Sequence, residues 1–198
     1  MECKVITIGH DYGSGGRDIG KLLAEMLNYK YYDSEITAQM VKESGLAESF
    51  VKNNSEYASH SNYFLFTLNN WTSGGPSLVD QLYFLQRQII IDLAQKENCV
   101  IVGHCSDYAL KNISNCFHIY IQSNINARVD RVINQYHEEL DDPVKELKER
   151  DNRRKTYYRY YTDRKLNDLG NYDLVIDRTH LSDEDCVEII YQVLSKLE

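Results

Sequence analysis

The chain of 198 residues holds few of the residues that interrupt a fold, with two prolines, ten glycines and one tryptophan. It contains no internal repeat, low-complexity tract or long linker, so we expect a single domain over 1–198. No apolar run approaches the roughly 20 residues needed to cross a bilayer, and the N-terminus lacks the pattern of a secretion signal. Secretion and membrane insertion are therefore disfavoured, and we expect a cytoplasmic protein.

Cysteine and histidine are also too sparsely arranged to form the usual cross-links or metal sites. The five cysteines are odd in number, widely spaced and never arranged as CxxC, which excludes a simple disulfide framework and the usual zinc spacing. The six histidines show no HxxxH or HExxH spacing, so no metal site built from protein ligands alone is expected. We expect reduced cysteines, most of them small buried apolar side chains.

The charge of the chain is unevenly distributed. Twenty-two basic and 30 acidic residues give a formal net charge of −8, which argues against binding to nucleic acid or to an anionic membrane surface. Between Lys145 and Lys165, however, nine basic and four acidic residues give +5, which leaves −13 on the rest. A basic island in an acidic protein suggests a small anionic partner.

Short apolar runs alternate with amphipathic segments along the chain. Strands are expected at about 5–8, 29–32, 99–103, 117–121 and 172–176, with helices between them and a last helix capped by Ser182. This alternation predicts an α/β fold with a parallel sheet and helices on both faces. Two segments fit the scheme poorly, the polar stretch 47–78 and the charged stretch 140–162, and we expect each to project from the carboxyl edge as a cover or lid.

A glycine-rich stretch, GHDYGSGGRD, joins the first expected strand to the first expected helix. Glycines permit a backbone path that points consecutive N–H groups inward, so this loop is predicted to bind donor phosphates. The Walker template GxxxxGK[ST] fails in every frame, because its lysine is absent, and Arg17 is the obvious replacement for that charge. The alternative is a tight turn without a ligand. The candidate donor-binding residues are Gly13, Ser14, Gly15, Gly16, Arg17 and Asp18.

Six segments together resemble the cytidylate kinase-like family of P-loop nucleoside monophosphate kinases. They are ITIGHDYGSGGRDIGKLLAEML, YYDSE, VIVGHCSDYAL, INARVDRV, DNRRKTYYRYYT and NYDLVIDRTHLS, which span nearly the whole chain. The resemblance implies a three-layer P-loop NTPase fold with a five-stranded parallel sheet. It also implies ATP as the phosphate donor on the glycine loop, an acceptor-side excursion at 47–78 and an arginine-rich lid at 140–162.

The arginines of the lid segment are the predicted catalytic residues, together with Arg17. Phosphoryl transfer needs aligned reactants and positive charge on the transferring group, which Arg150, Arg153 and Arg154 would supply. Asp151 and Arg154 are spaced to share one helical face, and the resemblance implies that they hold a cytidine monophosphate acceptor. The alternative is a solvated helix rich in salt bridges.

Other candidates come from the resemblance, each with a structural alternative. Asp33 and Ser34 match a pair near the acceptor and magnesium, or they cap a helix. Arg128 and Arg131 match an arginine helix whose first member covers the donor base, or they lie on a surface helix. Four tyrosines beside the lid arginines invite base stacking, but packing against the core is the favoured interpretation; they are Tyr157, Tyr158, Tyr160 and Tyr161.

Two histidines depart from the family pattern. His104 stands where a phosphate-binding arginine of a DGR motif is expected, and His10 also stands in place of an arginine. Histidine is largely neutral near pH 7, so both contacts would be weakened. The leading hypothesis is an ATP-dependent kinase of nucleoside monophosphates, cytidylate first, with His104 on the acceptor side and Mg²⁺ arriving on the nucleotide. The alternatives are a non-catalytic nucleotide sensor and a P-loop kinase of another small acceptor.

Overall fold

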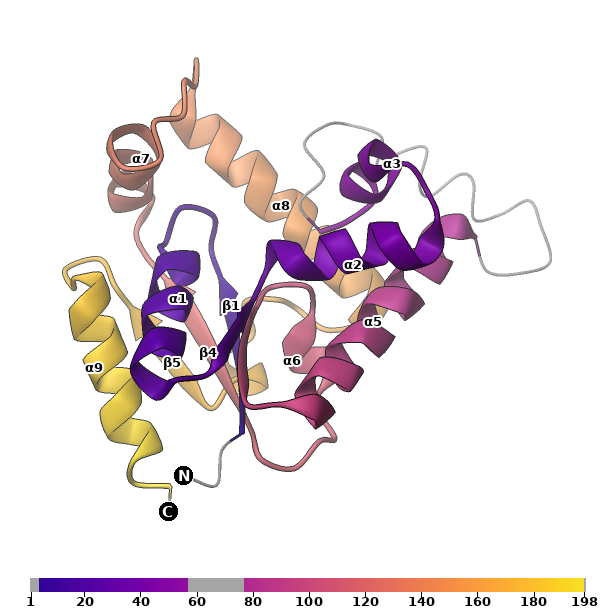
Figure 1. Cartoon of the computed structure of the whole chain (residues 1–198). Helices are drawn as coiled ribbons and strands as arrows, with labels where there is room; N and C mark the ends of the chain where they lie inside the picture. Colours follow the sequence, from indigo (N-terminus) through magenta and orange to yellow (C-terminus); the bar gives the residue numbers. More distant parts are fainter. Residues whose placement is uncertain (1–3, 57–76, 198) are drawn as a thin grey trace.

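Five parallel strands form the centre of the molecule. The computed structural model describes residues 4–56 and 77–197. Within these residues the sheet has the order β2-β3-β1-β4-β5, and every pairing is parallel, as the sequence predicts (Figure 1). The strands are β1 (Val5–His10), β2 (Lys30–Tyr32), β3 (Cys99–Val102), β4 (Cys116–Gln122) and β5 (Leu174–Asp177).

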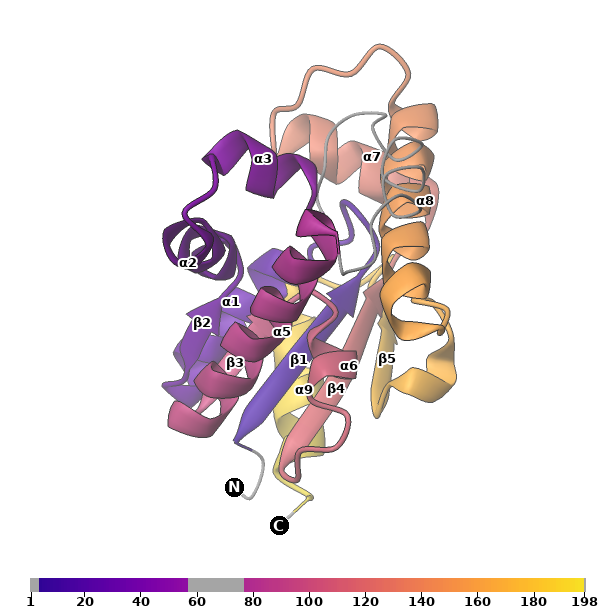
Figure 2. The ribbon, with the colours of Figure 1, turned by 90° about the vertical axis from the view of Figure 1, so that its right-hand side faces the viewer.

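Helices cover both faces of this sheet. The helices α1 and α9 pack on one face, while α2, α3, α5 and α6 lie on the other, and α8 crosses the carboxyl ends of the strands (Figures 1 and 2). The helical elements are α1 (Gly16–Leu27), α2 (Ser34–Ser44), α3 (Glu48–Asn53), α5 (Leu78–Lys96), α6 (Ser106–Ala109), α7 (Ile125–Asn134), α8 (Pro143–Thr162), the 3₁₀ turn η1 (Leu169–Asn171) and α9 (Asp183–Leu194).

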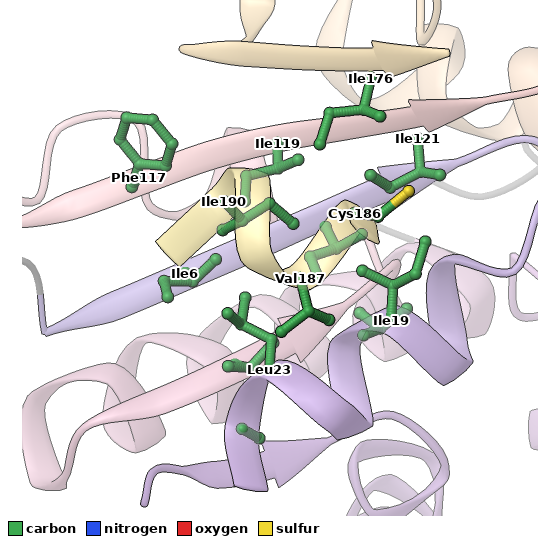
Figure 3. Close-up of a cluster of buried hydrophobic side chains, with 14 of the residues drawn as sticks. Ile6, Ile19, Leu23, Phe117, Ile119, Ile121, Ile176, Cys186, Val187 and Ile190 are labelled. Carbon is green, nitrogen blue, oxygen red and sulfur yellow. The ribbon is translucent and has the colours of Figure 1, made fainter. Parts of the chain in front are cut away.

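The central strand β1 is buried along its entire length, because both of its faces carry apolar side chains. Ile6 points toward α1 and α9, where it meets Leu23 and Val187 (Figure 3). Ile8 belongs to the same cluster. Val5 points to the opposite face and joins the cluster under α2 and α5. This two-sided burial explains why the strands are apolar runs without alternation in the sequence. Because β1 is the central strand, its carboxyl end lies in the middle of the sheet edge where ligands bind in open α/β folds.

The strand boundaries differ slightly from those expected. The first strand continues to His10, and the third ends at Val102 because Gly103, His104 and Cys105 all adopt positive φ angles, of 71°, 60° and 54°. Three successive left-handed residues cannot continue a strand. The last strand begins at Leu174 rather than at residue 172. The N-cap predicted at Ser182 is confirmed by a capping box with Asp185.

The charged segment 140–162 forms mostly one long helix, α8, whose inner face is buried. Asp142 caps its first turn by accepting a hydrogen bond from the Lys145 N–H, and Asp163, with φ of 55°, ends it. Buried residues on the inner face include Asp151 and Arg154, so the interpretation of a fully solvated helix is wrong for this face. The motion implied by a lid stays a prediction.

The tyrosines of α8 fasten its C-terminal half to the core. Tyr157 and Tyr158 are buried, and the ring of Tyr161 stacks on that of Tyr83 from α5 with centroids 3.9 Å apart. Packing against the core is therefore confirmed for these side chains, while Tyr160 is 46% exposed. Of the predicted acceptor-side excursion 47–78, the structure describes α3 and its neighbouring residues, and 57–76 lie outside the described residues.

A buried carboxylic acid links α6 to this tyrosine cluster. The Tyr158 hydroxyl donates to Asp107 Oδ2 at 2.5 Å, and burial raises the pKa of Asp107 from the ordinary 3.8 to about 6. The folded state therefore binds a proton more tightly than the unfolded state does. The contribution of protonated Asp107 to the free energy of unfolding is complete below about pH 4 and is lost as the pH rises through 6.

We therefore expect Asp107→Asn, which keeps an acceptor for Tyr158 but cannot ionise, to gain stability relative to the wild type as the pH rises from 4 to 7. Two pKa units correspond to about 3 kcal/mol in the free energy of unfolding, measured by urea denaturation at each pH. Asp92→Asn, at an exposed position on α5, is the control and should show a difference that does not vary with pH. A pH-independent difference for Asp107→Asn would contradict the assignment.

Candidate functional site

The glycine loop leaves the carboxyl end of β1 and enters α1 directly. Gly13 and Gly15 adopt left-handed φ angles of 77° and 83°, and Gly15 stands at the N-cap of α1. Ser14 is fully buried, with its hydroxyl 2.9 Å from the carbonyl oxygens of both Asp11 and Ile121. The loop is thus anchored to β4 and leads into the N-terminus of α1, where backbone N–H groups favour an anion in general. Anion binding at this loop stays a prediction.

The side chain of His10 explains why the Walker lysine is absent. In the frame that takes Gly15 as the last glycine of the template, Gly16 stands at the lysine position. A Cβ atom at Gly16 would lie 2.5 Å from the Cβ of His10 and 2.6 Å from its Cγ. No side chain fits at position 16 while His10 keeps this conformation. Burial, with Arg154 and Arg17 nearby, lowers the pKa of His10 well below its ordinary value, so the ring is neutral.

Arg17 points from the first turn of α1 toward α2. Its Nε lies 2.8 Å from Asp33 Oδ2, and its side chain is 48% exposed. Asp33 and Arg17 line a cavity of about 630 Å³ between α2 and α3. The role of Arg17 as a substitute for the lysine stays a prediction, since the structure directs this side chain toward Asp33. The other residues lining the cavity are Ser34, Glu35, Thr37, Ala38, Val41, Glu48, Lys52, Asn53 and Ser55.

Asp33 is held by the site rather than by the helix that follows it. It stands at the N-cap of α2, as the capping alternative predicts, but its side chain makes no capping hydrogen bond to that helix. The buried ring of His104 places Nε2 2.9 Å from the Asp33 carbonyl oxygen and 3.7 Å from its Oδ1. Within the described residues Asp33 Oδ1 has no hydrogen-bond partner. His104 therefore holds the backbone of Asp33, and its role in binding an acceptor stays a prediction.

Arg154 joins three parts of the site and is 2% exposed. Its Nη1 donates to the carbonyl oxygen of His10 at 2.6 Å, while Nε and Nη2 donate to Glu56 Oε1 at 3.0 and 2.9 Å. Both bonds end on the same carboxylate oxygen, and the buried Glu56 Oε2 has no hydrogen-bond partner among the described residues. Glu56 was not a sequence candidate, because it lies in a polar segment without a motif.

Arg128 and Asp151 form a second buried pair beside the loop. Arg128 Nη1 lies 2.6 Å from Asp151 Oδ2 and 3.1 Å from the carbonyl oxygen of Tyr12, while Asp151 Oδ1 accepts from the Tyr12 N–H at 2.9 Å. The two side chains clamp the loop backbone from α7 and α8. Arg128 is 7% exposed, which contradicts the surface-helix interpretation, and Asp151 faces the loop rather than the cavity. Their ligand-binding roles stay predictions.

The other two arginines predicted to be catalytic, Arg150 and Arg153 on α8, differ in how they are held. Arg150 contacts the hydroxyl of Tyr12, lies over its ring at 4.5 Å and pairs with Glu138 at 2.7 Å. Burial and the hydrogen bond to Glu138 raise the pKa of Tyr12 to about 12, so this hydroxyl stays protonated at neutral pH. Arg153 is half-buried and forms no ion pair with any described residue. Tyr12 and Glu138 were not sequence candidates.

The described residues contain no group of three histidine, cysteine or acidic side chains placed to hold a metal ion. Asp33, with its unpartnered Oδ1 beside the loop, is a carboxylate that fits a Mg²⁺ ion arriving on phosphates. No helix among the described residues is long and apolar enough to span a membrane. Among the cysteines that the structure describes, Cys99, Cys105 and Cys186 are free thiols.

The close approach of His10 to position 16 predicts that the effect of Gly16→Ala on the free energy of unfolding depends on residue 10. Glycine to alanine within a helix normally stabilises a protein, but we expect Gly16→Ala to lower the free energy of unfolding by about 1–3 kcal/mol because of overpacking. In a His10→Gly background the same substitution should become neutral or stabilising. Gly170→Ala, whose Cβ would meet only Asp168 Oδ1 at 3.4 Å, is the control and should have little effect in urea denaturation. Equal effects of Gly16→Ala in both backgrounds would show that His10 is not the obstacle.

Comparison with solved structures supports the fold. An uncharacterized protein from Eubacterium ventriosum has a TM-score of 0.72 at 22% identity, and the match covers 96% of this chain and 98% of that one. The shikimate kinase of Acinetobacter baumannii, solved in complex with shikimate, has a TM-score of 0.59 at 14% identity, covering 99% and 95%. These similarities show a P-loop kinase fold, as expected from the sequence.

Comparison with related sequences indicates the family of this chain. The chain is 24% identical to a cytidylate kinase of Sulfolobus acidocaldarius, over 96% of this chain and 94% of that protein. It is 27% identical to a cytidylate kinase of Pyrococcus furiosus, over 99% and 91%. The model of the cytidylate kinase-like family matches residues 5–180. The glycine loop, the cavity between α2 and α3 and the arginines of α8 all lie within that match, and the chain belongs to the cytidylate kinase-like family.

Proposed function

We propose that this protein transfers the γ-phosphoryl group of ATP to a nucleoside monophosphate, with cytidine monophosphate the first acceptor to test. The observation that carries the proposal is the Arg17–Asp33 pair, 2.8 Å apart, which connects the first turn of α1 to the cavity between α2 and α3. The N-terminus of α1 therefore borders both the loop proposed to bind the donor and the cavity proposed to bind the acceptor. Family membership and the cytidylate kinase relatives support this choice of acceptor.

The acceptor would bind in the cavity with its phosphate at Arg17. A guanidinium that binds a carboxylate through its planar edge offers the same edge to phosphate oxygens, so an acceptor phosphate can compete with Asp33 for Arg17. Lys52, Asn53 and Ser34 add polar groups to the wall of the cavity. An amide such as that of Asn53 can both donate to and accept from the polar edge of a base.

The donor would lie on the glycine loop, with its phosphates at the N-terminus of α1. In the transfer, an oxygen of the acceptor phosphate bonds to the γ-phosphorus, and the bond from that phosphorus to the β,γ-bridging oxygen breaks. A nucleoside diphosphate is released from each side. Arg150, Arg153 and Arg154 on α8 supply positive charge for the oxygens of the transferring group.

When bound, Mg²⁺ neutralises charge on the donor phosphates, and Asp33 Oδ1 is the protein oxygen that we assign to it. The carboxylates that now hold the arginines keep these cations in place before ligands arrive. Glu56 holds Arg154, and Glu138 holds Arg150. We further propose a cytoplasmic location and small nucleotides, rather than nucleic acids, as partners, since the net charge of −8 opposes polyanion binding.

Arg153 offers the cleanest test of transfer, because its substitution breaks no ion pair with the described residues. We expect Arg153→Gln to reduce turnover roughly 100-fold, because it removes a positive charge that would face the transferring phosphoryl group. The affinity for ATP should stay within a few-fold of the wild-type value. Turnover is measured by coupled detection of ADP with the monophosphates of cytidine, uridine and adenosine. Arg87→Gln, at an exposed site on α5, is the matched control and should retain full turnover.

Wild-type protein that binds ATP but turns over none of the monophosphates would contradict the proposal. That result would favour a non-catalytic nucleotide sensor, for which the closed pairing of Arg128 and Arg154 with carboxylates would describe the resting state. Turnover with a small hydroxyl compound such as shikimate, and with no monophosphate, would instead assign another acceptor to the same cavity.

A further inference from the structure

Arg178, in the connection between β5 and α9, carries unused hydrogen-bond donors in a buried position. The side chain is 9% exposed. Its Nη2 donates to the carbonyl oxygen of Leu181 at 2.9 Å and lies 3.2 Å from Asp183 Oδ1. Neither Nε nor Nη1 donates to any residue that the structure describes. A buried N–H of a charged group without an acceptor is costly, so its retention requires an explanation.

These donors lie against the glycine loop. A Cβ atom at Gly15 would be 2.8 Å from Arg178 Nη1 and 2.9 Å from Arg131 Nη1. Gly15 is the N-cap of α1, where backbone N–H groups already favour an anion. Two guanidinium groups therefore converge on the part of the loop that is predicted to hold the donor phosphates.

The neighbouring carboxylates keep both guanidinium groups in place. Asp183, in the first turn of α9, lies 3.1 Å from Arg131 Nη1 and 3.2 Å from Arg178 Nη2. Asp18 pairs with Arg131 at 3.2 Å. Arg131 thus pairs with two carboxylates. Arg178 has one weakly aligned carboxylate partner, Asp183, and its Nε and Nη1 remain without an acceptor among the described residues. A cation fixed in this way needs little reorganisation when an anion arrives.

The other cations near the loop are committed elsewhere. The position for a lysine at residue 16 is closed by His10, and Arg17 turns to Asp33. Arg128 donates through Nη1 to Asp151 and a loop carbonyl, and its Nε has no partner among the described residues. Arg154 binds Glu56 and the carbonyl of His10. Among the described residues, Arg178 is the buried guanidinium with both Nε and Nη1 unpaired beside the loop.

We propose that Arg178 is a donor-binding residue, whose Nη1 edge contacts a phosphate oxygen of the nucleoside triphosphate on the glycine loop. It supplies from the β5–α9 connection the positive charge that a Walker lysine would supply from within the loop. This inference rests on the proposed function for the identity of the ligand. It predicts recognition of the phosphate chain and not of the base or ribose.

The test compares Arg178→Gln with the wild type by calorimetric titration of ATP, inorganic tripolyphosphate and adenosine. A hydrogen bond to a charged group corresponds to roughly 10- to 100-fold in affinity, so Kd for ATP and tripolyphosphate should rise by that factor. The affinity for adenosine should stay unchanged. Arg178→Lys, which keeps the charge but loses the planar fork, should fall between the two. Arg87→Gln is again the matched control.

A purely structural role gives a different pattern. It predicts a lower melting temperature and an equal loss of affinity for ATP and adenosine, and that result overturns the inference. Unchanged ATP affinity in Arg178→Gln overturns it as well. If Arg178→Gln fails to fold, Arg178→Lys decides by the same comparison of ATP with adenosine. Wild-type protein that binds ATP without transferring its phosphoryl group contradicts only the proposed function, whereas wild type that binds neither ATP nor tripolyphosphate contradicts both.

Discussion

The contact on which the rest of the site depends is made by the buried guanidinium of Arg154. It donates to the carbonyl oxygen of His10, the last residue of the central strand, and to Glu56, which follows α3. Through these bonds α8, the glycine loop and the acceptor side are held at one edge of the sheet. A buried arginine requires such partners, because an unpaired charge in the interior is strongly destabilising. The need to satisfy this one cation therefore determines how α8 sits over the loop.

The same arrangement recurs around the site and reconciles an acidic chain with a phosphate-binding function. Arg17, Arg128 and Arg154 each bind a carboxylate, respectively Asp33, Asp151 and Glu56. Carboxylates and phosphates present similar oxygens to a guanidinium, so these pairs hold cations in position without leaving them uncompensated. The acidic scaffold repels long polyanions, while the arginines remain confined to one edge of the sheet, where a small anion can meet several of them.

A steric constraint determines where the positive charge of the loop can come from. Because His10 fills the space beside Gly16, a lysine does not fit at position 16. Arginine side chains from other elements surround the loop instead. Arginine suits that role, since its long side chain reaches from a neighbouring helix or connection and its planar fork keeps a defined direction. In the proposed function the loop provides backbone N–H groups and a close approach, and α7, α8 and the β5–α9 connection provide charge.

The sequence by itself determined the alternation of strands and helices, the parallel sheet, the glycine loop and the packing of the α8 tyrosines, because each follows from local patterns of apolar and glycine residues. It also placed Arg128, Asp151 and Arg154 near the site. Only the tertiary structure decided their partners. Glu56 meets Arg154 across 98 positions, and Arg178 reaches Gly15 from the far end of the chain. Such pairings depend on how the elements pack and on the direction of each side chain, which no local pattern contains. For the same reason, the turn of Arg17 toward Asp33 and the obstruction of position 16 by His10 became visible only in the folded chain.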